Sequence, residues 1–233
     1  MDVRPIPGLA AIPFAEVWFH AIDDDAWAEA SERARALGKT GLEVWTTTRT
    51  PEVAAFLEAR GYVEHRRYVI SELDVASAPE EPPALPVTTF AEHPELADEL
   101  YALARVAYAD QPGRSETVFG DEWYEWGLRA HRPDAYFVVL EDDRLLGYGY
   151  LEEDPWGHGF TAVARDARGR GVAGAIKRAQ IAWAKEHGIA TLRTANEVRL
   201  TGMLDLNRRL GYCPLYEEVI MRGPIRSSSR RST

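Results

Sequence analysis

The stretch Arg168-Gly169-Arg170-Gly171-Val172-Ala173 decides the fold of this chain. Its two glycines allow the backbone to turn so that several N–H groups point into one concavity. The apolar pattern of the following residues, Val172–His187, predicts a long helix whose positive dipole end faces the same concavity. We therefore interpret the stretch as a loop that holds a diphosphate, with Arg168 and Arg170 adding positive charge.

The residues around the loop predict an α/β fold, with a mixed sheet and helices packed on it. A strand at Gly159–Ala164 leads into the loop, and Asp142-Asp143 suits the tight turn of an antiparallel hairpin just before it. The other expected elements are a strand at Pro86–Phe90, helices at Pro94–Ala109 and Asp121–His131, hairpin strands at Ala135–Glu141 and Arg144–Leu151, a strand at Leu192–Asn196, a helix at Thr201–Leu210 and a closing strand at Tyr212–Arg222.

Part of this pattern occurs twice, at a spacing of 150 residues. A predicted helix ends near Gly38 and another near Gly188, and each is followed by a strand, a second helix and a further Gly-Tyr pair. The stretch between Val75 and Pro86, rich in Pro, Ala and Glu, indicates a linker between the copies. We expect a partial domain at 1–75, a linker at 76–85, a complete catalytic domain at 86–223 and a disordered tail at 224–233.

The stretch from Tyr136 to Arg222 resembles the GCN5-related N-acetyltransferase (GNAT) family. The family's mark is Arg/Gln-x-x-Gly-x-Gly/Ala, which Arg168, Gly171 and Ala173 match between a strand and a long amphipathic helix. Residues 1–75 resemble only the back half of the same fold. The whole chain is thus similar to tandem GNAT proteins of the mycothiol-synthase type, with a truncated, degenerate first copy.

The resemblance implies an N-acetyltransferase that passes an acetyl or similar acyl group from acetyl-coenzyme A, or another acyl-CoA, to a primary amine of a small molecule by direct attack, without a metal. The residues implied in coenzyme binding are Thr161, Ala162 and Val163 beside the pantetheine arm, Arg168, Gly169, Arg170, Gly171, Val172 and Ala173 around the pyrophosphate, and Asn196 and Asn207 near the pantetheine or the substrate.

The chain departs from the family where a tyrosine often protonates the leaving thiolate. Asn207 stands there and has no proton to give at neutral pH, so Tyr212 or Tyr216 could substitute or the thiolate could leave directly. The amine needs a base, and the candidates are Glu152, Glu153, Asp154 and His158. Strand alternation puts Glu152 and Glu153 on opposite faces. Our catalytic candidates are Glu152, His158 and Tyr212.

Three other interpretations stay open. Gly169, Gly171 and Gly174 also spell a dinucleotide-binding fingerprint, although an antiparallel hairpin precedes them and the expected acidic residue is missing. Transfer from another carrier, such as aminoacyl-tRNA, is a second alternative. A third is a module that binds acyl-CoA without turnover.

Composition narrows the class of partner. The net charge of -10 argues against nucleic acid and suits a cationic amine. No apolar run is long enough for a membrane span and no export signal is seen, so we expect a cytoplasmic protein without membrane partners. The single Cys213 excludes an intrachain disulfide. The sequence leaves open whether the chain forms a homodimer.

Two expectations concern regions outside the loop. In the first copy, Ile22-Asp23-Asp24-Asp25 joins strand to helix without any glycine, so we expect no coenzyme A there. We expect the walls of the substrate pocket to come from Ala109–Gly120, Trp123, Trp126 and Trp156, although these aromatic residues are equally compatible with a core.

Overall fold

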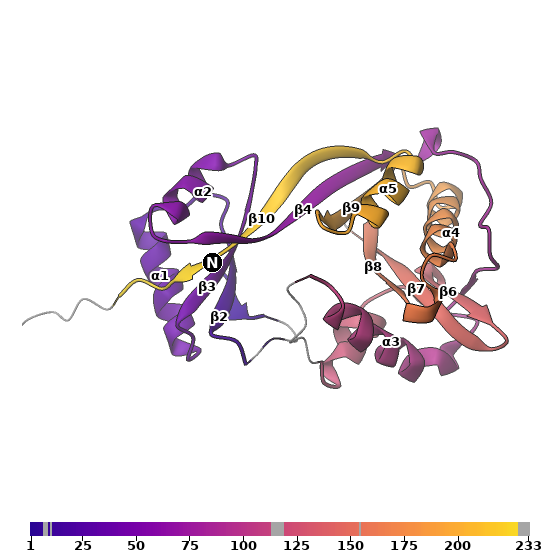
Figure 1. Ribbon diagram of the computed structural model, residues 1–233, viewed down its shortest axis with the longest axis horizontal. Helices are drawn as coiled ribbons and strands as arrows, with labels where there is room; N and C mark the ends of the chain where they lie inside the picture. The colour runs from indigo at the N-terminus through magenta and orange to yellow at the C-terminus, as the bar shows by residue number, and fades with distance from the viewer. Residues whose placement is uncertain (7–8, 10, 113–118, 154, 228–233) are drawn as a thin grey trace, which may run out of the picture. The chain divides into compact units, whose positions relative to one another are not determined.

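The computed structural model describes residues 1–6, 9, 11–112, 119–153 and 155–227, and they form two compact units (Figure 1). The first unit comprises Met1–Val69 and Tyr216–Thr233, and the second comprises Ile70–Leu215. Two long strands, β4 (Val63–Asp74) and β10 (Cys213–Pro224), contribute residues to both units. Residues 228–233 of the predicted tail lie outside the described residues.

The first unit is a sheet with two helices on one face. Its strands follow the order β1 (Val3–Pro5), β2 (Phe14–Trp18), β3 (Gly41–Thr47), β10 and β4. Helix α1 (Asp24–Ala36) begins after Asp23, whose carboxylate accepts the amide hydrogen of Ala26 at 2.8 Å. Buried residues of α1 and of α2 (Pro51–Glu58) pack in one apolar cluster with Ala15, Val17, Leu42 and Val44 of the sheet.

The second unit is a mixed sheet covered on both faces. From the edge inward, β5 (Thr88–Thr89), β6 (Tyr136–Glu141), β7 (Arg144–Glu152) and β8 (Gly157–Val163) are antiparallel, and β9 (Thr191–Glu197) is parallel to β8. One core lies under α4 (Val172–Glu186) and another under α3 (Ala97–Ala109). Helix α5 is Thr201–Arg209. None of the described helices is long and apolar enough to cross a membrane.

Two local predictions before the loop have different outcomes. Asp142 and Asp143 have φ of 50° and 61°, the left-handed values of a two-residue hairpin turn, so the predicted turn is confirmed. The predicted helix at Asp121–His131 is instead a π-helix at Tyr124–Arg129. Three ring-bearing residues, Trp123, Tyr124 and Trp126, contact aromatic rings of α3, and the wider π turn accommodates these contacts.

The repeat of 150 residues is present in the structure. Strand β9, helix α5 and strand β10 begin 150 residues after β3, α2 and β4. Gly38 and Gly188, which follow α1 and α4, have φ of 72° and 68°, and Gly61 and Gly211 have φ of 83° and 93°. These positive values are the left-handed conformation that ends a helix and that glycine adopts without strain.

The two copies exchange their last strands. In the first unit β10 pairs antiparallel with β3, and in the second unit β4 lies next to β9. Matching ion pairs hold both arrangements, with the charges interchanged: Arg222 of β10 bonds Glu43 of β3, and Arg193 of β9 bonds Glu72 of β4. Each unit therefore contains a strand that the sequence pattern assigns to the other.

This exchange changes the division of the chain. The predicted catalytic domain, 86–223, begins later and ends later than the compact unit Ile70–Leu215. The predicted linker, 76–85, lies within that unit and packs along α4, where Glu80 pairs with Lys185 and Glu81 with Arg178. Local patterning could not show this, because strand pairing depends on partners far away in the sequence.

Candidate active site

Strands β8 and β9 separate soon after they begin to pair. Among the described residues their register contains one pair, Gly157 with Arg193, next to a 3.0 Å hydrogen bond from Arg193 N to the Trp156 carbonyl. On its other edge β8 stays with β7 as far as Val163, through one register shift that bends the strand. The edge of β8 that faces β9 is thus open to an extended ligand.

The loop at the end of β8 presents unused amides. Gly169 and Gly171 have φ of 77° and 85°, and a Cβ at either position would meet no atom within 4 Å. The amides of Arg168 and Arg170 make only long 3.4 Å bonds within the loop. In the described part of the chain no such bond is found for Gly169 or Gly171, and the first helical amides, from Val172 on, have no partner inside α4. Among the described residues, the amides of the loop and of the first turn of α4 are thus free to bind a diphosphate.

The sequence analysis expected Arg168 and Arg170 to add positive charge to the loop. In the structure both guanidinium groups are paired with carboxylates. Arg165 and Arg168 both pair with Asp110 at the end of α3, and Arg170 pairs with Glu141. The two guanidinium groups lower the pKa of Asp110 to about 2, chiefly through the bond from Arg165. Because exposed pairs of this kind contribute little stability, an incoming phosphate can take over the guanidinium groups at small cost.

Two of the three predicted catalytic residues meet in a buried cluster on the α4 side of the sheet. The Tyr212 hydroxyl hydrogen-bonds His158 Nε2, and His158 Nδ1 lies 2.7 Å from the side-chain oxygen Oε1 of Gln180. These partners assign the ring hydrogen to Nδ1. Burial lowers the pKa of His158 well below its usual value, with a further contribution from the positive charge of Lys177. Burial also raises the pKa of Tyr212.

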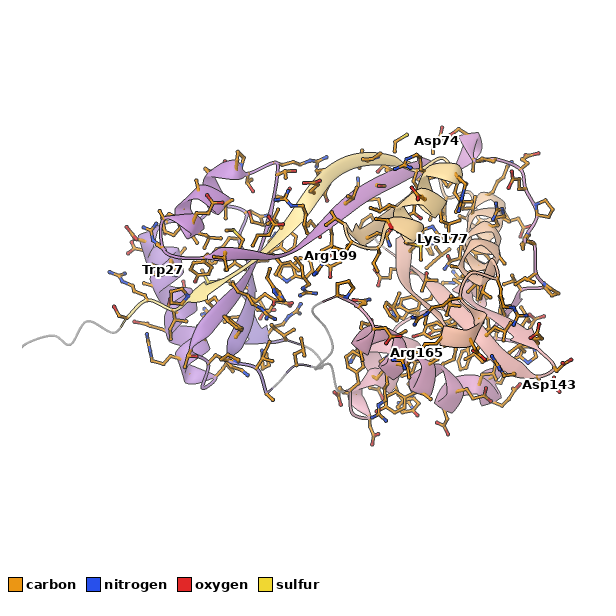
Figure 2. The ribbon with its side chains drawn as sticks, viewed as in Figure 1. Trp27, Asp74, Asp143, Arg165, Lys177 and Arg199 are labelled. Carbon is orange, nitrogen blue, oxygen red and sulfur yellow. The ribbon has the colours of Figure 1, made fainter. Side chains whose placement is uncertain are left out.

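A buried lysine continues this cluster. Lys177 of α4 is 1% exposed, and its Nζ lies 3.4 Å from Thr194 Oγ1 and 5.5 Å from the centre of the Tyr212 ring. Thr194 donates to Asn196 Oδ1 at 3.1 Å, and Asn207 donates to the same oxygen. Desolvation lowers the pKa of Lys177 from 10.5 to about 7. The two predicted asparagines are therefore brought together and linked to a lysine (labelled in Figure 2).

The third catalytic candidate, Glu152, lies apart from this cluster. It is exposed at the end of β7, two residues after Tyr150, whose ring packs in the core under α3. Partial desolvation nonetheless raises the pKa of Glu152. Strand alternation and the opposite core assignments put Glu152 and His158 on different faces of the sheet. Glu153 is exposed, and Asp154 lies outside the described residues.

The predicted coenzyme residues of β8 alternate between the two faces. Ala162 is 1% exposed in the core under α3, while Val163 packs against the core under α4. The Val163 carbonyl accepts a 3.3 Å hydrogen bond from Arg168 Nε. Because the side chains of Ala162 and Val163 pack in the two cores, these two residues offer a ligand at the open edge chiefly their backbone.

The tryptophans expected to form pocket walls are mainly core residues. Trp123 is 1% exposed in the core under α3, and Trp156 packs on Trp183 against the core under α4. Trp126 contacts Tyr108 and Phe119 and is half-buried. Of the wall segment 109–120, residues 113–118 lie outside the described residues. Apolar packing explains these tryptophans without a ligand.

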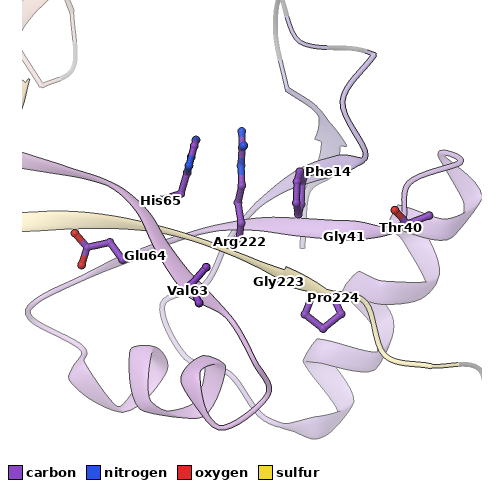
Figure 3. Close-up of a pocket in the computed structure, with 9 residues that line it drawn as sticks. All are labelled: Phe14, Thr40, Gly41, Val63, Glu64, His65, Arg222, Gly223 and Pro224. Carbon is purple, nitrogen blue, oxygen red and sulfur yellow. The ribbon is translucent and has the colours of Figure 1, made fainter. Parts of the chain in front are cut away.

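In the described part of the first unit, the equivalent pair of strands is closed. Strands β2 and β3 pair in parallel from Phe14–Gly41 to Trp18–Trp45. A pocket of about 500 Å³ lies elsewhere in this unit, where Phe14, His65 and Arg222 point to the same side of the strands (Figure 3). Its arginine bonds Glu43 and lies 4.8 Å over the Phe14 ring. The described residues that line this pocket include Gly41 and Gly223, and neither of them has the positive φ of the loop glycines.

The sequence reasoning missed three members of the buried cluster, Lys177, Gln180 and Thr194. A signal was present, because Lys177 and Gln180 interrupt the apolar stripe of α4 between Ala173 and Ala184. A charged residue in such a stripe is rarely fully buried without a specific reason.

The comparisons with known proteins agree with this geometry. Residues 97–212 match the model of the acetyltransferase (GNAT) family. No curated protein matches the chain. The match identifies residues 97–212 as a GNAT acetyltransferase domain, so the protein is an acyltransferase that uses acyl-coenzyme A.

Solved structures share the fold at low sequence identity. A GCN5-related N-acetyltransferase from Sphaerobacter thermophilus is 18% identical, with 98% of this chain and 77% of that one covered and a TM-score of 0.67. A tandem GNAT protein from the clavulanic acid biosynthesis pathway is 20% identical, with 94% and 77% covered and a TM-score of 0.67. A GCN5-related N-acetyltransferase from Kribbella flavida is 17% identical, with 91% and 81% covered and a TM-score of 0.58. At these identities the likeness concerns the fold, a mixed α/β sheet, and it is consistent with a tandem arrangement.

Proposed function

We propose that the protein transfers an acetyl group from acetyl-coenzyme A to a primary amine of a small molecule. The observation that carries this proposal is the opening between β8 and β9, which ends at a loop with unused amides. In this proposal the amides of Gly169–Ala173 hold the pyrophosphate, and the free edge of β8 pairs with the pantetheine arm.

The amine acceptor must lose a proton before its nitrogen can attack the thioester. Glu152 is our proposed base, because its raised pKa makes it a better proton acceptor than an ordinary exposed carboxylate. His158 is less suited, since it is buried and both of its ring nitrogens have partners. The acidic net charge of -10 favours an ammonium-bearing substrate over an anionic one.

The first copy, in this proposal, does not bind coenzyme A. Its β2 and β3 are paired where β8 and β9 are open, and Asp23 caps α1 where the glycine loop precedes α4. A carboxylate at that position repels a diphosphate. A reduced first copy is the feature on which the similarity to mycothiol-synthase-type proteins rests, and that similarity stays a proposal.

Calorimetric titration with acetyl-CoA tests the binding site. The wild-type protein should bind, and Gly171→Ala should weaken binding at least tenfold, because φ of 85° strains an L-residue and displaces the amides of the loop. Gly188→Ala is the matched control, since its φ is 68° at the other end of α4 and it carries a similar strain. Failure of the wild-type protein to bind would reject the proposed function.

Thiol release in the presence of an amine panel separates the alternatives. An acetyltransferase releases free coenzyme A, whereas a binding module without turnover releases none. Turnover that requires an aminoacyl-tRNA would instead support transfer from another carrier. The non-catalytic alternative is supported by Asn207, which cannot donate a proton at neutral pH and stands where the resemblance places a proton donor.

A further inference from the structure

The repeat supplies an internal control for the buried polar cluster. An offset of 150 residues relates Lys177 to Trp27, Gln180 to Ala30, Thr194 to Val44 and Asn207 to Leu57. Tyr62, the counterpart of Tyr212, accepts a 3.1 Å hydrogen bond from Trp27, which takes the place of the lysine. The same fold is therefore built in the first copy with apolar residues at these positions, so folding alone does not require the polar ones.

The lysine lies where β8 and β9 separate. Gly157 and Arg193 form the single register pair, and the next residues along the two strands are His158 and Thr194. Lys177 Nζ bonds Thr194 and is close enough to His158 to lower the pKa of that ring. A chain anchored at the glycine loop and extended along β8 runs from Val163 back toward Gly157. Its far end then approaches the ammonium group of Lys177.

The cluster has unused hydrogen-bonding capacity. Gln180 is fully buried and Asn207 is 3% exposed, yet Gln180 Nε2 and Asn207 Oδ1 have no partner among the described residues. The ammonium of Lys177 has three donors and makes one long bond to the residues that the structure describes. Buried groups left in this state cost free energy in the free protein. Their arrangement at the end of an open groove indicates that a ligand group completes it.

We propose that Lys177 donates a proton to the sulfur of coenzyme A as the thioester is cleaved; this inference rests on the proposed function. The amine nitrogen bonds to the acyl carbon and the C–S bond breaks, leaving its electron pair on sulfur. The sulfur takes a proton from the ammonium of Lys177, and the amine gives up its own proton to Glu152 or water. The lysine then regains a proton from solvent, so protons balance over the cycle.

The surroundings of Lys177 suit this role. His158 of β8 and Thr194 of β9 face the lysine, and so does Tyr212, which directly precedes β10. The strand residues packed against α4 from β6 and β7 are apolar or glycine. Glu197, a buried carboxylate at the end of β9, is bonded to Arg199. Among the described residues no carboxylate pairs with Lys177. Desolvation lowers the pKa of its ammonium group to about 7, so the group releases its proton readily at neutral pH.

The test measures thiol release from acetyl-CoA with the best acceptor of a panel of primary amines, or with water where no amine reacts. We expect Lys177→Met to lower release about 100-fold while the affinity for acetyl-CoA, measured by calorimetry, changes less than threefold. The wild-type rate should fall as pH rises through the pKa of the lysine, and this alkaline decline should be absent in Lys177→Met. Lys185→Met, an exposed lysine on the same helix, should match wild type.

The outcomes separate the inference from the function on which it rests. Unchanged release and an unchanged pH profile in Lys177→Met would overturn the inference, and so would loss of acetyl-CoA binding, which would make Lys177 a binding residue. Lys177→Gln, which can still donate to Thr194, replaces the Met variant if that variant does not fold. A wild-type protein that neither binds acetyl-CoA nor releases thiol would reject the proposed function and the inference together.

Discussion

Two parallel strand pairs of this molecule, β2–β3 and β8–β9, occupy equivalent places in the two copies and differ in one respect. The first pair keeps its register from Phe14 to Trp18, and the Phe19 amide adds a 3.3 Å bond to the Trp45 carbonyl. The second pair has one register position among the residues that the structure describes. The difference shows how one supersecondary unit can be either a closed scaffold or an open groove.

The backbone geometry of β8 and of the loop that follows it accounts for the opening between β8 and β9. A register shift between β7 and β8 bends β8, and a Cβ at Gly159 would lie 2.0 Å from the Tyr150 ring, so only glycine fits at the bend. The strand then runs into a glycine loop rather than directly into a capped helix. In the closed pair no glycine interrupts β2, and the connection to α1 is short and acidic.

The largest expected effect on stability concerns Lys177. Because its pKa is lowered from 10.5 to about 7 on folding, the unfolded chain holds more protons between these values, and wild-type stability rises with pH there. Lys177→Met removes this penalty. We expect the variant to be more stable than wild type at pH 7, by up to roughly 4 kcal/mol, with the difference shrinking toward pH 10.

Urea unfolding of both proteins at several pH values measures this difference. A variant that is less stable than wild type at every pH would show that the lysine is a structural group, contrary to the comparison with Trp27 of the first copy.

A smaller effect is expected from exchanging residues between the copies. Leu57→Asn should destabilise the protein by roughly 3 kcal/mol, because it removes apolar volume and buries an amide without partners. Asn207→Leu, the reverse change at the equivalent position, removes the unpartnered Oδ1 and should change stability by less than about 1 kcal/mol. Equal losses from both changes, measured by thermal unfolding, would mean that Asn207 is as structural as Leu57.

Much of the second unit could be predicted from sequence because its signals are local. The paired aspartates of the hairpin turn and the two glycines of the loop each specify their own backbone conformation. The repeat was visible because Gly38 and Gly188 end helices by the same left-handed turn.

The rest depends on contacts between distant residues. The placement of β10 beside β3 follows from pairing across more than 170 residues, as in the bond from Arg222 to Glu43. The pairing of Arg168 with Asp110 and the burial of Lys177 likewise arise only when separate elements pack together. Patterns within one helix or strand contain no information about such partners.

Amide hydrogen exchange with and without acetyl-CoA tests the contrast between the two strand pairs most directly. The account predicts slower exchange on addition of acetyl-CoA in residues 158–173, which include the open edge of β8 and the glycine loop, and no change in residues 14–26 of the first copy. Protection of residues 14–26, or unchanged exchange in residues 158–173, would contradict it.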